Sequence, residues 1–105
     1  MLALSVRQPH AENILRGIKK IQYRSKRVSE KLIGRRFYIY AARQPAKGLE
    51  REAAGLPVGL IVGSAIISRC IRGRGIWEWH LSDVQSLRKP LKPTGMPQAV
   101  WFKPF

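Results

Sequence analysis

Three closely spaced polar side chains, Lys19, Gln22 and Arg24, are of the types that bind anions and contact nucleobases. The guanidinium group of Arg24 is planar and makes paired hydrogen bonds to a phosphate or a base edge, whereas Lys19 acts as a point charge. The Gln22 amide both donates and accepts hydrogen bonds, which suits a base edge. The segment therefore predicts a polar site for a phosphate-bearing ligand.

The charge of the chain favours the same class of ligand. Twenty Lys and Arg against six Asp and Glu give a net charge of +14, which attracts polyanions such as nucleic acids. Nine of the twenty basic residues lie in two acid-free spans, 13–29 and 53–77, although a solvated, solubilising surface is an alternative explanation. The expected phosphate contacts at the rim of the site are Lys26, Arg27, Arg72 and Arg74.

The elements that must position these residues are mostly strands. Apolar and polar residues alternate over 2–7 and 18–24, and between them Pro9 and Gly17 bound a short predicted helix, 9–16. Glycines within the β-branched run 57–72 predict a bend or bulge near Gly63. Further strands are expected over 35–42, 76–81, 84–87 and 99–102, a short helix around 49–54, and a Pro-rich turn from Pro90 to Pro97.

Length and composition predict one domain, 1–105, without a membrane span. The single cysteine, Cys70, cannot form an internal disulfide bond, and the short apolar N-terminal stretch does not suit a signal peptide, so we expect a soluble cytoplasmic protein. His10 and His80 lack the Cys or acidic companions of a metal site, and we expect no metal and no cofactor.

Several segments together resemble the ASCH domain, a member of the PUA-like superfamily. They are Leu4-Ser-Val-Arg-Gln-Pro-His10, Gly17-x-Lys19-x-x-Gln22-x-Arg24, the tyrosine-rich strand ending in Ala41-Ala42, Val58-Gly-x-Ile-Val-Gly63 and Trp79-His-Leu-Ser-Asp-Val84. The resemblance implies an α+β, mainly β architecture, a PUA-like small mixed β-barrel with short flanking helices. It also implies a role in RNA binding, and some members of the family are hydrolases on RNA or modified nucleosides.

The resemblance adds three residues to the site. Arg7 and Gln8 match positions that line the cleft in the family, and His10 stands where the family usually has Trp and is expected to contact the ligand by stacking. For Gln8, a helix-capping or loop hydrogen bond is the alternative role, and for Arg24 the alternative is a salt bridge to Glu78 or Asp83. Trp77, Trp79 and Trp101 are expected in the core rather than stacked on bases.

One departure from the family pattern bears on catalysis. Gln22 stands where the family usually has Glu, and a neutral amide cannot accept a proton or neutralise Lys19. We therefore expect a binding module for RNA or single-stranded nucleic acid, DNA included, rather than an enzyme. The alternative is an RNA-directed hydrolase, a ribonuclease or modified-nucleoside amidohydrolase, in which Lys19 acts as nucleophile or base. A protein-interaction module is a third hypothesis, and oligomeric state is open.

Overall fold

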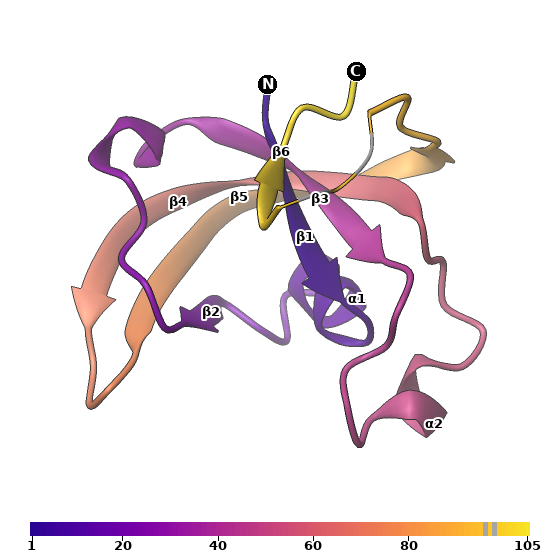
Figure 1. The fold of residues 1–105 in the computed structure, drawn as a ribbon, viewed down its shortest axis with the longest axis horizontal. Coiled ribbons are helices and arrows are strands. Elements are labelled where there is room, and N and C mark those ends of the chain that lie inside the picture. The colour runs from indigo at the N-terminus through magenta and orange to yellow at the C-terminus, as the bar shows by residue number, and fades with distance from the viewer. Residues whose placement is uncertain (96, 98) are drawn as a thin grey trace.

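The chain folds around one strongly curved, six-stranded sheet, which a computed structural model describes for residues 1–95, 97 and 99–105 (Figure 1). The strands are β1 (Ala3–Arg7), β2 (Ile21–Arg24), β3 (Arg36–Ala42), β4 (Leu60–Arg72), β5 (Trp77–Leu91) and β6 (Trp101–Phe102). The helices are α1 (His10–Leu15), α2 (Glu50–Ala53) and a 3-10 turn, η1 (Glu30–Leu32). No helix in the described part of the chain is long and apolar enough to cross a membrane.

The strand order is β2-β5-β4-β3-β1-β6, and the sheet is mixed because β1 pairs with β3 in parallel while every other pairing is antiparallel. The sheet curls into a half-barrel, with β4 and β5 forming the long curved hairpin in Figure 1. Parallel pairing places the carboxyl ends of β1 and β3 side by side, with Arg7 in register with Ala42. The segments that follow these two strands therefore leave from the same end of the sheet.

The main core lies inside the curl, where Leu4, Val6, Phe37 and Ile39 pack with Trp79. Helix α1 closes it with Ala11 and Ile14. A smaller cluster around Tyr40, Ile61 and Phe102 covers the other face of the sheet. Trp79 is buried and stacks on Trp101 with ring centroids 6.0 Å apart, which confirms that these two aromatic residues belong to the packing of the domain.

The curvature near Gly63 is confirmed. The pairing of β4 with β5 shifts register between Ile61 and Gly63, and a Cβ atom on Gly63 would lie 2.5 Å from the Gln85 carbonyl oxygen and 2.5 Å from Leu15 Cδ2. Only glycine leaves room for β5 and α1 to approach so closely. At Gly63 the register shift bends β4, and the missing side chain lets β5 and α1 pack closely against it.

Three sequence interpretations are wrong in the C-terminal half. The expected strands 76–81 and 84–87 form one strand, β5, which continues through Asp83 at a positive φ of 47° and runs to Leu91. Pro90 thus lies within β5 rather than in a turn. Proline has no N–H group to donate to a neighbouring strand, and this is tolerated near the end of a strand, where few inter-strand hydrogen bonds form. The final strand is also shorter than the expected 99–102 and comprises only Trp101 and Phe102.

Candidate nucleic-acid interface

An open cleft of about 780 Å³ lies where β2, one edge of the sheet, approaches β1 near the other edge. We call it the seam cleft. Its walls come from β1, β2, β3, the loop that follows β3 and the segment before β6. The ionisable basic residues that line it are Arg7, His10, Arg24, Arg43 and Lys47, and none of the described lining residues is Asp or Glu.

Arg24 joins β2, one edge of the curled sheet, to β1 near the other edge. Its Nη2 donates a hydrogen bond of 2.9 Å to the Ser5 carbonyl oxygen on β1, and its guanidinium carbon lies 5.7 Å from the centroid of the Trp79 ring. With the Gln22 amide oxygen turned toward it, Arg24 also donates from Nε and Nη2, both at 3.0 Å. Among the described residues, the Ser5 and Gln22 oxygens accept from Nε and Nη2, so both N–H groups of Nη1 remain available to a ligand.

The acceptors around Arg24 are uncharged, so its positive charge is not neutralised. The predicted alternative, a salt bridge to Glu78 or Asp83, is wrong because Glu78 contacts His80 Nε2 at 3.1 Å and Asp83 pairs with Arg36. Desolvation by burial lowers the pKa of Arg24 below its ordinary value, which shows that the site holds a cation at some cost. An anionic ligand would offset that cost.

Gln22 is only 7 % exposed and faces Trp79 across the β2–β5 pair, whereas its neighbour Tyr23 is half-exposed. The alternation over this strand was predicted, but the polar residues, Gln22 and Arg24, occupy the inward face. A buried amide requires hydrogen-bonding partners, and Arg24 supplies two donors to the amide oxygen. Gln22 therefore orients Arg24 while also lining the cleft.

Lys19 lies beside the cleft rather than among the residues that line it. The turn after α1 positions it, because the Asn13 carbonyl oxygen accepts hydrogen bonds of 3.0 Å from both the Ile18 and Lys19 N–H groups. Its ammonium nitrogen lies 5.3 Å from the centroid of the Tyr23 ring. Desolvation and, secondarily, the charge of Arg24 lower the pKa of Lys19 below its ordinary value.

His10 begins α1 and lines the cleft. Desolvation is the main cause that lowers its pKa below the ordinary value, and the nearby positive charge of Lys19 adds to the effect. Both effects favour the neutral ring, which offers an uncharged aromatic surface to the cleft. In the described ranges, no three or more His, Cys, Asp or Glu side chains gather closely enough to hold a metal ion.

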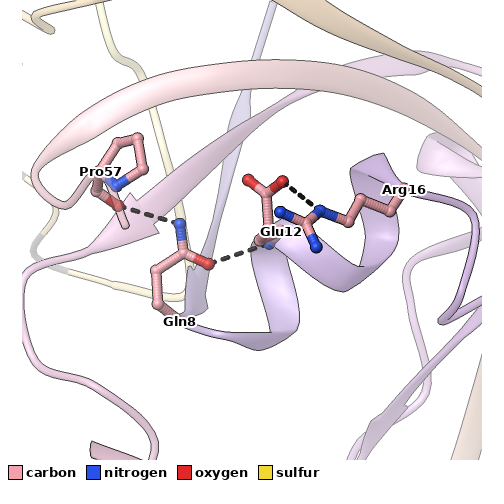
Figure 2. A network of polar contacts seen from close by, with 4 residues as sticks. All are labelled: Gln8, Glu12, Arg16 and Pro57. Carbon is pink, nitrogen blue, oxygen red and sulfur yellow. Dashed lines mark hydrogen bonds and ion pairs between the residues drawn. The ribbon is translucent and has the colours of Figure 1, made fainter. Parts of the chain in front are cut away.

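Gln8 is completely buried, and the structure gives it the alternative, structural role rather than a place in the cleft lining (Figure 2). Its amide nitrogen donates to the Pro57 carbonyl oxygen at 2.9 Å, and its amide oxygen accepts from the Glu12 backbone N–H at 2.9 Å. Its own carbonyl oxygen accepts from the Ala46 N–H at 2.8 Å. Gln8 thus ties α1, the segment before β4 and the loop after β3 together behind the cleft.

The remaining predicted contacts do not line the seam cleft. Lys26 and Arg27 follow β2, while Arg72 and Arg74 lie at the tip of the β4–β5 hairpin, and all four side chains are exposed. The cleft instead contains residues that the sequence did not single out, namely Ser5, Tyr23, Tyr40, Arg43, Gln44 and Lys47. Arg43 and Lys47 follow β3, and their place became evident only from the parallel pairing of β3 with β1.

The arrangement of strands defines a small, mainly β fold of the PUA-like class. Crystal structures of the ASCH protein from Zymomonas mobilis are similar to it: one aligns with 17% identity and a TM-score of 0.69, covering 96% of this chain and 85% of that one. Mutant proteins of the same ASCH align with TM-scores of 0.70 and 0.63 at 17% and 19% identity, covering 96% and 87% of this chain and 87% and 72% of theirs. This chain therefore has an ASCH-like fold, as its sequence motifs predicted. No protein-family profile and no curated protein matches the sequence.

Proposed function

We propose that the protein binds single-stranded nucleic acid, RNA in particular, in the seam cleft. The observation that carries this proposal is the combination of four Lys or Arg side chains with no described acidic residue in one open cleft. Phosphate groups supply most of the affinity of nucleic acids for proteins, and they do so through such cations. A reduced, cytoplasmic setting would suit the single cysteine of the chain.

The distribution of the acidic residues supports the proposal. Glu12 pairs with Arg16, Glu30 with Arg27 and Asp83 with Arg36. These carboxylates neutralise basic residues elsewhere on the surface, whereas the cations of the cleft keep their charge. The cleft is therefore a place where uncancelled positive charge and access for a ligand coincide.

The shape of the cleft favours unpaired nucleotides over a duplex. A concave site of about 780 Å³ falls in the range of pockets that enclose small organic ligands, and it suits a nucleotide or two. Duplex DNA, in contrast, is read by a convex helix or ribbon that enters a groove. Gln22 and the Tyr23 ring are the side chains we expect beside a base, while Arg24, Arg43 and Lys47 contact phosphates.

Fluorescence anisotropy with labelled RNA and DNA oligonucleotides at rising salt tests the proposal. We expect binding that weakens with salt, and the double variant Arg43→Ala/Lys47→Ala lowers the slope of log K against log salt by about 1.4, or about 0.7 for each lost phosphate contact. Arg88→Ala/Lys89→Ala is the matched control, because these exposed residues of β5 lie outside the cleft. Absence of salt-sensitive binding to either nucleic acid, or equal effects of the two double variants, refutes the proposal.

Hydrolysis of RNA or of a modified nucleoside is the second candidate, favoured by the lowered pKa of Lys19 beside the cleft. A lysine whose neutral form is more accessible is a better nucleophile or base. Incubation with labelled RNA and with an acylated cytidine tests this activity, and turnover lost in both Lys19→Ala and Lys19→Arg supports it. Binding without turnover leaves the binding function as the conclusion.

A further inference from the structure

A row of three side chains crosses the sheet beside the seam cleft. Arg24 on β2 lies directly opposite Trp77 on β5, and Trp77 lies directly opposite Arg72 on β4. Residues in direct register point to the same face of a sheet, so the three side chains share one face. We call them the inner row. Neighbouring strands are about 4.8 Å apart, so the backbone of Arg72 lies roughly 10 Å from that of Arg24.

Trp77 supports two exposed arginines. The guanidinium carbon of Arg72 lies 6.0 Å from the centroid of the Trp77 ring, and that of Arg27 lies 5.9 Å from it. Cation–π contact restrains a long side chain and leaves the N–H groups at its edge to form hydrogen bonds. An arginine held in this way loses less conformational freedom when it binds a phosphate.

The two arginines differ in their other partners. Arg27 also donates to Glu30 at 2.8 Å, so part of its charge is neutralised. Arg72 makes no ion pair with any carboxylate of the described residues. Arg72 is consequently the stronger candidate for an anion contact at this end of the hairpin.

The opposite face of the same hairpin does not share this character. Arg69 lies opposite His80 and Ile71 opposite Glu78, and the Glu78 carboxylate contacts His80. An acidic side chain on that face repels a phosphate backbone. The arginines supported by Trp77 therefore lie on the face of the inner row, away from the Glu78 carboxylate, and Arg24 connects this face to the seam cleft.

We propose that the inner row, together with Arg27, is a track for the sugar-phosphate backbone of a strand whose base occupies the seam cleft. The inference rests on the proposed function and specifies its ligand as an oligonucleotide rather than a mononucleotide. The nucleotide in the cleft contacts Arg24, and about one or two neighbouring phosphates contact Arg72 and Arg27. The contacts of the track are to the backbone and therefore do not select sequence.

Competition binding with three unlabelled ligands tests the track: a nucleoside monophosphate, a dinucleotide and a hexanucleotide of the same base. The variant Arg72→Ala is compared with Arg69→Ala, which removes the same charge from the same strand but from the opposite face. We expect Arg72→Ala to weaken hexanucleotide binding about fivefold and to lower its salt slope by about 0.7, with monophosphate binding unchanged. Arg69→Ala is expected to change neither.

The outcomes separate the track from the cleft. Equal effects of Arg72→Ala and Arg69→Ala, or a hexanucleotide that binds no more tightly than the monophosphate, overturn the track while leaving binding in the cleft intact. If none of the three ligands shows salt-sensitive binding, the proposed function is overturned and the track with it. Both variants alter exposed side chains, so the native fold should persist, and a thermal melt of each variant checks this.

Discussion

Substituting Gln22→Glu converts the principal acceptor of Arg24 into a carboxylate without changing the length of the side chain. The Gln22 amide oxygen already receives hydrogen bonds of 3.0 Å from two nitrogen atoms of Arg24. A glutamate in the same place would form a paired, charge-assisted contact with the guanidinium group. The charge of Arg24 would then be neutralised from inside the protein, and we expect the variant to bind nucleic acid more weakly.

The distances give the magnitude. The carboxylate would lie 3.0 Å from the guanidinium nitrogens, and a phosphate contacts the other side of the group at about 2.8 Å, so the two negative charges would be roughly 8 Å apart once the width of the guanidinium group is included. Two unit charges at that distance repel by about 2 kcal/mol at an effective dielectric constant of ~20. Water and salt in the open cleft screen this repulsion. We therefore expect a loss of binding free energy of about 1.4 kcal/mol at physiological ionic strength, which corresponds to a tenfold loss of affinity.

Anisotropy titrations of a labelled hexanucleotide measure the effect at two salt concentrations. Gln85→Glu is the control, since it adds the same charge at an exposed position of β5 that does not line the cleft. We expect a tenfold loss for Gln22→Glu, a smaller change for Gln85→Glu, and a difference between them that shrinks as salt rises. If the two variants bind equally well, Arg24 does not contact the ligand and the reasoning fails.

Three further predictions concern the surroundings of the cleft. Gln8→Leu leaves two backbone groups without their 2.9 Å partners and is expected to lower the free energy of unfolding in urea by about 2 kcal/mol, without changing the affinity of the folded protein. Gly63→Ala places a Cβ atom 2.5 Å from a carbonyl oxygen and a leucine methyl, so it is expected to cost about 3 kcal/mol, against about 1 kcal/mol for Gly34→Ala, where φ is +82° but no atom lies within 4 Å. The pKa of His10 is lowered, so its ring gains charge only as pH falls below about 6.5. Acidification from pH 7 to 5.5 should therefore strengthen oligonucleotide binding and weaken stability in the wild type, since a bound anion favours the proton and the folded apoprotein disfavours it. If His10→Ala shows the same pH dependence of binding and stability as the wild type, the pH dependence does not come from His10.

Local patterns were sufficient to predict the elements that surround the first helix. Proline and glycine bounded the helix 9–16, which the structure places at His10–Leu15, and alternation identified the strands on either side of it. The position of Gly17 at the C-terminal end of that helix is confirmed by its φ of 76°. These features depend on interactions between residues near in sequence, which is why one chain was enough to infer them.

The composition of the site depended on pairings that the sequence does not reveal. Arg43 and Lys47 enter the cleft because β3 runs parallel to β1, a contact between strands about thirty residues apart. Gln8 lies outside the cleft lining because its side-chain amide donates a hydrogen bond to the carbonyl oxygen of Pro57, almost fifty residues further on. The inward position of Arg24 was equally hidden, since alternation shows which residues share a face but not which face is covered by the rest of the molecule.

The side-by-side carboxyl ends of β1 and β3 separate the scaffold from the groups that would contact a ligand. In the loop after β3, Ala46 is buried and anchored to Gln8, while Arg43, Gln44 and Lys47 project outward and contribute nothing to the core. A library of variants randomised at those three outward positions would therefore change the groups that face a ligand. The Ala46–Gln8 contact and the strands would stay unchanged in every variant.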